Sequence, residues 1–374
     1  MSERRFEALI MTLDALIRER DGWADLARES LEPNPFYEPD FLTAQTHLRP
    51  KREIHCLVVR DKIDDSRLCG VFPLEKPHLR DGLPFGALAL YRNPYTCLTT
   101  PLIRYGDADA ILKAALDQLA RNSKRLLIPM IPENRPFACL LRAHAKTRGL
   151  DIHRVDGRVR AAVETALNMG DYRTRLWKKN TRSAERSRLK RLEALGSVQY
   201  RRIGSAEPEA SQVLEAFLAL EARGWKGKRD TALASHPDTL AFAKAALLPE
   251  PGFGETIYEM LQLDGKPIAI SVNLVAGGVG YALKSTYDEE FATLGVGTLL
   301  DGMSISLATG GGPLSRLDSC AAMDHPIRHR WRQEERVGRY LLGLVPGTQT
   351  SAISRWLGLI GPFGVWRGYG LNEA

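Results

Sequence analysis

The segment GVGYALKSTYDEEFATLGVGTLLDGMSISLA, residues 278–308, decides the fold of the second half of the chain. It begins as a strand-like run, GVGYALKSTY, and an apolar helical pattern starts near Thr298. Gly295 and Gly297 lie in the turn between the two. Glycines at a helix start let an anion approach backbone N–H groups, and the helix dipole favours negative charge there. The segment therefore predicts a strand, a glycine-containing turn and a helix. Taken alone, such a turn is more often a plain helix entry than a phosphate site.

More elements flank this segment. The runs ETIYEMLQLDG (255–265) and KPIAISVNLVAGG (266–278) precede it as strands, and the turns at Asp264-Gly265 and Gly277-Gly278 favour antiparallel pairing. The run LSRLDSC (314–320) closes the unit as a further strand. Earlier in this half, we expect a basic helix over Tyr172–Leu195, the strand SVQYRRI (197–203), and helices over residues 208–228 and 236–248.

The first half shows a similar alternation. Residues 1–26 predict an amphipathic helix, because the helical period continues through Glu7 and Asp14. NPFYEPDFL (34–42) predicts a turn into a second helix, and IHCLVVR (54–60) with RLCGVFPLEK (67–76) predicts a hairpin. A helix over 107–123, a buried strand over 125–131 and a helix over 136–149 follow. The fold class is therefore α/β, in a mixed α+β arrangement.

Composition restricts the class of protein. A chain of 374 residues, 44% hydrophobic and 26% charged, suits two folded domains and excludes disorder. No stretch reaches the roughly 20 apolar residues of a membrane span. The five cysteines are scattered and the histidines lack metal-ligand spacing, so we expect no disulfide framework and no metal, and a cytoplasmic location.

The net charge of +7 is concentrated between Tyr172 and Arg202, which implies an anionic partner for that segment alone. Nucleic acid, an acyl carrier protein and the 3′-phosphate of coenzyme A are alternatives. Nucleic acid is the least favoured of them, because only Trp177 offers an aromatic ring among the basic residues. The plainest interpretation is a solvated helix face.

Four segments, in this order, resemble the FemAB-related acetyltransferase group of the GNAT superfamily, the CelD or cellulose-biosynthesis acetyltransferases. They are LEALGSVQYRRI (192–203), FLALEARGWKGK (217–228), residues 265–291, and LGVGTLLDGMSISLATGGG (294–312) followed by LSRLDSC. With NPFYEPDFL and CGVFPLEK from the first half, the resemblance covers about residues 20–342.

This resemblance implies two GNAT-like domains, each a mostly antiparallel mixed sheet flanked by helices. We expect an N-terminal domain over residues 1–160, a C-terminal acyltransferase domain over 161–345 and an apolar, glycine-containing tail over 346–374. The implied activity is N- or O-acyl transfer from acetyl-CoA or another acyl-CoA to a small-molecule or saccharide acceptor, in exopolysaccharide or envelope biosynthesis.

The resemblance also implies where the donor binds. In this superfamily the pyrophosphate lies at the turn between the fourth strand and the next helix, here Leu294, Gly295, Val296, Gly297 and Thr298. We expect both glycines to present unpaired N–H groups there. The superfamily pattern has Arg or Gln before the glycines, and this chain has Ala292 at that position. The strand 278–287 is expected to diverge from its neighbour, which frees N–H groups to polarise the thioester carbonyl.

Side chains for the chemistry are expected in the same segments. Glu221 or Asp288 is a candidate base and Tyr287 a candidate acid for the leaving thiolate. Substrate-binding candidates are Trp225 with Lys226, as an aromatic wall beside a cation, together with Lys284 and with Asp318 at the end of the last strand. The alternative for each is structural: a capping carboxylate, a half-buried tyrosine, a buried tryptophan with a lysine extended to solvent.

Two other functions stay open at this point. Distant FemAB relatives use aminoacyl-tRNA as donor, which together with the basic helix suggests a tRNA-dependent aminoacyl transferase. Ala292 is also compatible with a scaffold that keeps the fold and lacks the activity.

Overall fold

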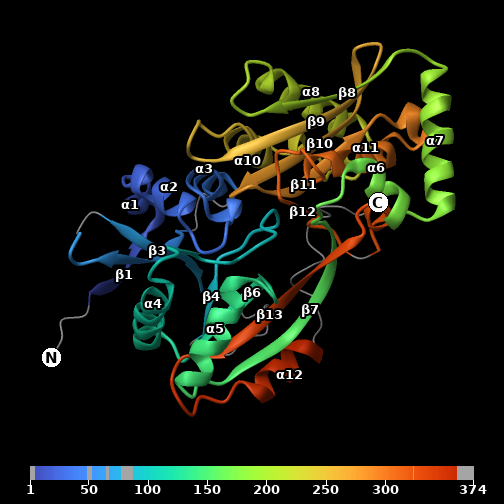
Figure 1. The fold of residues 1–374 in the computed structure, drawn as a ribbon. Helices are drawn as coiled ribbons and strands as arrows, with labels where there is room; N and C mark the ends of the chain where they lie inside the picture. Colours follow the sequence, from blue (N-terminus) through green and yellow to red (C-terminus); the bar gives the residue numbers. More distant parts are fainter. Residues whose placement is uncertain (1–4, 49–52, 65–66, 77–86, 323, 360–374) are drawn as a thin grey trace. The chain divides into compact units, whose positions relative to one another are not determined.

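The computed structural model describes residues 5–48, 53–64, 67–76, 87–322 and 324–359, and these form two compact units (Figure 1). The first unit comprises the described residues of Met1–Thr43, Arg49–Arg158 and Arg336–Tyr369. The second comprises those of Ala44–Leu48 and Val159–Glu335. Each unit is described by itself below.

The first unit is built on a mostly antiparallel sheet. Its strand order is β1-β2-β3-β4-β6-β13, with only β4 and β6 parallel. The short β5 (Leu102–Ile103) pairs with β3 beside this path. The bounds of the other strands are β1 (Phe6–Thr12), β2 (His55–Asp61), β3 (Leu68–Glu75), β4 (Ala87–Leu90), β6 (Arg125–Pro132) and β13 (Gln333–Gly343).

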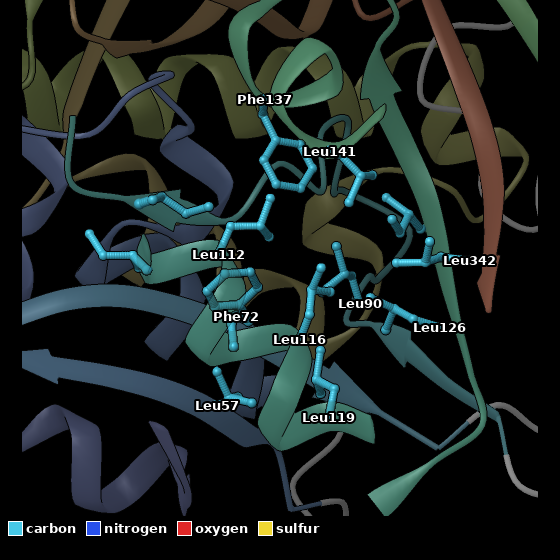
Figure 2. Close-up of a cluster of buried hydrophobic side chains, with 14 of the residues drawn as sticks. Leu57, Phe72, Leu90, Leu112, Leu116, Leu119, Leu126, Phe137, Leu141 and Leu342 are labelled. Carbon is cyan, nitrogen blue, oxygen red and sulfur yellow. The ribbon is translucent and has the colours of Figure 1, made fainter. Parts of the chain in front are cut away.

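Helices of the first unit cover this sheet and form its core. Leu112, Leu116 and Leu119 of α4 (Ala108–Asn122) are buried against strand residues that include Phe72 (Figure 2). Helix α5 (Pro136–Thr147) contributes Phe137 and Leu141 to the same cluster. The other helices of this unit are α1 (Leu13–Ile17), α2 (Arg20–Arg28), α3 (Pro39–Ala44) and α12 (Ser351–Leu359).

The expected helix over residues 1–26 is wrong in its first part. Residues 6–12 form β1, which pairs with β2 from Phe6↔Asp61 to Thr12↔His55. The sequence pattern of this short apolar run is compatible with a strand or a helix. Pairing with β2 determines that it is a strand. The helix starts only at Leu13, where Thr12 caps it by accepting a hydrogen bond from the Ala15 amide at 3.2 Å.

The C-terminal segment packs on the first unit as far as it is described. Leu357 of α12 is buried with Ala89, Leu127 and Leu341. Residues 360–374, most of the expected tail, lie outside the described residues. Within the described ranges, no helix has the length and apolar character needed to cross a bilayer.

The second unit has its own mixed sheet, with the order β7-β12-β11-β10-β9-β8. All pairs are antiparallel except β11 with β12. The sequence of β7 runs across the boundary between the units. The predicted fold class, α/β with mostly antiparallel mixed sheets flanked by helices, is therefore confirmed. The bounds are β7 (Ile152–Val163), β8 (Val198–Gly204), β9 (Glu255–Leu263), β10 (Lys266–Ala276), β11 (Val279–Tyr287) and β12 (Arg316–Asp318).

Strands β11 and β12 pair over only three residues. Val279, Gly280 and Tyr281 face Arg316, Leu317 and Asp318, and the ladder ends there. In the described part of the chain, no other strand pairs with residues 282–287 on that side. The register with β10 shifts at Val272/Asn273 and leaves Leu283 as a bulge, which increases local twist. The second half of β11 therefore has a free edge, as the expected divergence requires.

The expected basic helix is two helices, α6 (Met169–Leu176) and α7 (Lys179–Glu193). Trp177 between them has extended backbone angles and a buried side chain, whose indole donates to the Arg330 carbonyl at 2.8 Å. Because the Trp177 ring is buried, the chain leaves the helical conformation there, and the single helix expected from sequence is divided into α6 and α7. The remaining helices are α8 (Ala210–Arg223), α9 (Trp225–Lys228), α10 (Pro237–Leu247) and α11 (Val296–Ser304).

Substitution of Leu112 by Ala tests the core of the first unit. Leu112 is fully buried in the cluster of Figure 2, so we expect a loss of about 2–5 kcal/mol in the free energy of unfolding. Ile63→Ala, at a site 83% exposed, is the matched control and should change it by less than about 0.5 kcal/mol. Chemical denaturation measures both, and equal effects would contradict the packing described.

Candidate active site

A cavity of about 210 Å³ opens in the second unit at the free edge of β11. Four segments form its wall: the end of α8 with α9, the last residues of β11, the turn into α11 with its first turn, and residues 325–326. The lining residues are Glu221, Gly224, Trp225, Lys226, Ser285, Thr286, Tyr287, Ala292, Gly295, Val296, Gly297, Thr298, Asp301, His325 and Pro326.

The start of α11 opens into this cavity. Gly295 has φ +64°, a left-handed conformation that favours glycine, and α11 begins at Val296, two residues before the expected start. The expectation for Gly295 is wrong in one respect, because its N–H donates to the Ala292 carbonyl at 2.9 Å. Among the described residues, the amides of Val296, Gly297 and Thr298 have no acceptor. The unpaired donors are therefore those of the first helical turn.

A side chain at Gly297 would crowd its neighbour in the strand, Tyr287. A Cβ at this position would lie 3.1 Å from Cδ1 of Tyr287. Glycine thus allows the Tyr287 ring to lie against the first turn of α11, and both residues line the cavity.

A buried cluster of three charges forms one wall. The carboxylate of Glu221 accepts a hydrogen bond from Lys284 Nζ at 2.5 Å and lies 3.5 Å from Lys226 Nζ. Its other oxygen accepts from the Leu233 amide at 2.8 Å. All three charged side chains are buried. One carboxylate between two lysines leaves an excess of positive charge beside the cavity.

Lys226 is the member of this cluster that faces the cavity together with Glu221. Burial, reinforced by the charge of Lys284 and opposed by Glu221, lowers the pKa of Lys226 to about 8. Its ammonium donates to the Ser285 carbonyl on the free edge of β11 at 2.7 Å. Trp225 is half-buried, with Lys226 Nζ 5.7 Å from its ring centroid. The lysine does not extend to solvent, so that structural alternative is excluded for Lys226.

Asp301 is a lining residue that the sequence analysis missed. It lies in α11 and is partly exposed, and burial raises the pKa of its carboxyl to about 7, with Arg330 opposing and Glu259 and Glu185 reinforcing the shift. A carboxyl with this pKa changes protonation near neutral pH, as a general base requires. A single acidic residue in the apolar run LLDGM is the signal that could have identified it.

His325 also lines the cavity and was not among the predicted site residues. Its Nδ1 accepts from the Ile327 amide at 3.2 Å. Burial and the charge of Lys226 lower the pKa of His325, and Asp324 opposes this, so the surroundings favour the neutral ring. Nothing in its sequence context indicated this position.

The remaining predicted residues do not line the cavity. Asp288 accepts from the Glu290 amide at 3.2 Å and caps a 3-10 helix, Glu289–Leu294. Lys284 is turned to Glu221, and Leu294 is buried in an apolar cluster. Asp318 is buried at the end of β12, where it accepts from the Cys320 amide at 2.8 Å and lies 3.4 Å from Arg160.

Comparison with known proteins connects this geometry to a family. Residues 179–325 match the family model of the acetyltransferase (GNAT) domain. The GNAT match contains every residue that lines the cavity except Pro326. It supports an acyltransferase, and the assignment to the CelD group stays a prediction. No curated protein matches this sequence. In the described ranges, no group of three or more His, Cys, Asp or Glu side chains is placed to hold a metal.

Solved structures show the same fold at low sequence identity. FemX is 12% identical with a TM-score of 0.57, covering 93% of this chain and 100% of that chain. A conserved protein of unknown function from Bacteroides thetaiotaomicron is 12% identical, with a TM-score of 0.56 and coverage of 89% and 100%. The C-terminal domain of a putative lysylphosphatidylglycerol synthetase from Agrobacterium fabrum is 12% identical, with a TM-score of 0.53 and coverage of 94% and 98%.

Glu221→Gln tests the buried charge cluster. Removal of the carboxylate charge leaves two buried lysines without their counterion, so we expect a loss of about 3–5 kcal/mol in unfolding free energy at pH 7. Glu215→Gln, on an exposed face of the same helix, is the control and should change stability by less than about 0.5 kcal/mol. A Glu221→Gln variant as stable as the wild type would contradict the role of Glu221 as the counterion of the two buried lysines.

Proposed function

We propose that the second unit transfers an acyl group from an acyl-CoA thioester to an amine or hydroxyl acceptor. The observation that carries this proposal is the set of three unpaired amides at the start of α11, which open into a cavity beside the free edge of β11. The amides suit a diphosphate, and a free strand edge suits the amide groups of a pantetheine arm. The GNAT match over the same residues supports both assignments.

In this proposal Val296, Gly297 and Thr298 hold the donor's pyrophosphate. The last residues of β11, Ser285 to Tyr287, lie along the thioester arm. Trp225 and Lys226 of α9 line the same cavity, and we place the acceptor beside them. Ala292 offers no polar side chain to the phosphates, so backbone donors carry this contact.

The reaction needs a base, an acid and a donor to the developing oxyanion. We assign the base to Asp301, which takes a proton from the acceptor as its nitrogen or oxygen bonds to the thioester carbon. The C–S bond breaks, and Tyr287 supplies the proton to the leaving thiolate. The ammonium of Lys226 has three donors, and the one not engaged by Ser285 or Glu221 serves the carbonyl oxygen. In this assignment Glu221 orients the lysines, and Asp288, which caps a 3-10 helix and does not line the cavity, is the alternative base.

The acceptor class follows less directly from the geometry. A small molecule or saccharide in envelope or exopolysaccharide biosynthesis stays the prediction from resemblance. A transferase that takes an aminoacyl group from tRNA is the second candidate, favoured by the exposed basic residues of α7 and by the fold shared with FemX. Binding of tRNA that weakens steeply with salt would favour this second candidate over the first.

Calorimetric titration tests donor binding. We expect acetyl-CoA or a longer acyl-CoA to bind with a stoichiometry of one and to raise the melting temperature at saturation. If no acyl-CoA binds or stabilises the protein at millimolar concentration, the proposal fails.

Asp301→Asn separates catalysis from binding. The amide cannot accept the acceptor's proton, so kcat should fall by about 10²–10⁴-fold while acyl-CoA affinity stays within about threefold. The wild-type rate should fall as pH drops below about 7, because Asp301 becomes protonated. Asp288→Asn is the matched control and should retain activity. A large loss in Asp288→Asn and none in Asp301→Asn would reverse the assignment of the base.

The raised pKa of Asp301 also predicts how the stability of the protein depends on pH. Its folded pKa of about 7 lies above the ordinary value of 3.8, so its neutral form favours the folded state. This contribution is complete below pH 4 and is lost as pH rises through 7. Asp301→Asn should therefore raise the melting temperature relative to wild type at pH 8 and change it little at pH 4. An equal shift at both pH values would contradict the raised pKa.

A further inference from the structure

Lys226 is a buried lysine whose amine is held at the wall of the cavity. Its side chain is only 5% exposed, and it is one of the residues that line the cavity. Its Nζ donates to the Ser285 carbonyl at 2.7 Å, on the free edge of β11. A Cβ at Gly227 would overlap the Ala222 carbonyl, so this glycine lets α9 pack closely on the end of α8. The local fold therefore fixes the position of the Lys226 side chain.

The charges around Lys226 leave its positive charge incompletely balanced. Glu221 accepts a hydrogen bond from Lys284 at 2.5 Å and lies 3.5 Å from Lys226, so Lys284 is the better paired lysine. Asp301 and His325 also line the cavity, and the surroundings favour the neutral ring of His325. Burial and the charge of Lys284 lower the pKa of Lys226 to about 8, against the opposing effect of Glu221. Loss of its proton leaves one carboxylate with one ammonium, which is a balanced pair.

The proposed donor site brings a thioester to this amine. The thioester arm is placed along Ser285 to Tyr287, and the protonated form of Lys226 donates to the thioester carbonyl oxygen in that assignment. When Nζ loses the proton, it presents a lone pair to the same carbonyl group. A desolvated neutral lysine amine is a nucleophile toward carbonyl carbon. The same side chain therefore assists transfer in one protonation state and competes with the acceptor in the other.

We propose that Lys226 is a self-acylation site, which takes the acyl group from the bound donor when no acceptor is present. Nζ bonds to the thioester carbon, the C–S bond breaks, and the products are an amide and the free thiol of CoA. The proton of the amine passes to the Asp301 carboxylate, and Tyr287 supplies the proton to the leaving thiolate. This inference rests on the proposed acyl-CoA transfer.

Acylation of Lys226 has a consequence for activity. An amide is much less reactive than a thioester, so the acyl group is not passed on to an acceptor. The modified side chain has no positive charge, and the donor to the developing oxyanion is lost. Self-acylation therefore limits the enzyme when donor is abundant and acceptor is scarce.

Mass mapping of the acylated protein tests this inference. The full chain is incubated with acetyl-CoA without an acceptor, at several values between about pH 6 and 9, and its peptides are analysed for added acetyl groups. We expect Lys226 to be acetylated at least about tenfold faster than Lys228 at pH 8. About half of Lys226 is neutral at that pH, whereas less than about 1% of an ordinary lysine in water is. The rate at Lys226 should rise with pH through about 8 and then level off.

Two variants and one competitor serve as controls. Lys228 lies in the same short helix, is exposed, pairs with Glu289 and does not line the cavity. Wild type and Lys228→Met should each release one equivalent of CoA thiol as Lys226 is acetylated, and Lys226→Met should not. Excess CoA, which carries no acyl group, should slow acetylation of Lys226 and leave Lys228 unaffected.

The outcomes separate this inference from the function on which it rests. If acetyl-CoA binds to the wild type and Lys226 stays unmodified up to about pH 9, self-acylation is overturned while the proposed function is retained. If Lys226 and Lys228 are acetylated at equal rates that CoA does not slow, the reaction is nonspecific and the inference is also overturned. If no acyl-CoA binds to the protein, the proposed function and this inference fail together.

Discussion

The short pairing of β12 with β11 is the constraint on which the site depends. Three residues of ladder hold the two strands together, and beyond Tyr281 the edge of β11 is left without a strand partner in the described chain. Backbone groups at a free edge need other partners, and Lys226 already occupies one of them at Ser285. The bulge at Leu283 and the turn at Gly295 then place the start of α11 beside the same edge. The free edge of β11 and the start of α11 therefore form parts of the wall of the same cavity.

Buried charge is the second property of this region. Glu221, Lys226 and Lys284 are removed from water, which is costly unless each charge finds a partner. The cluster meets this demand only in part, because two ammonium groups share one carboxylate. Asp301 also lines this cavity, and burial raises the pKa of its carboxyl to about 7, so its ionised and protonated forms are both populated near neutral pH. A cavity with excess positive charge and a carboxylate that can accept a proton suits an anionic donor and a proton transfer.

Much of the second unit could be predicted because local and tertiary signals agree there. The sequences of β9, β10 and β11 predict strands, and the glycine turn after them predicts the start of a helix, as the structure has them. The prediction failed where tertiary contacts decide. Phe6–Thr12 became a strand because β2 pairs with it, and the basic helix broke because Trp177 is buried. Strand β13 went unnoticed because the charged residues before it dominated that segment.

The same limit applies to the site residues. Trp225, Lys226, Tyr287 and the glycine turn were identified from sequence, and the structure brings them to one cavity. Asp301 and His325 were not identified, although the single acidic residue in the run LLDGM was a signal for Asp301. The roles of these two residues depend on which neighbours the fold supplies, and spacing along the chain does not contain that information. Location in the cell and the identity of the acceptor stay predictions for the same reason.

Hydrogen–deuterium exchange with and without saturating acetyl-CoA tests the central claim most directly. The account predicts slower exchange concentrated in residues 282–300, which hold the free edge of β11 and the unpaired amides of α11. Unchanged exchange throughout this segment under conditions of saturation, or protection confined to the first unit, would contradict it.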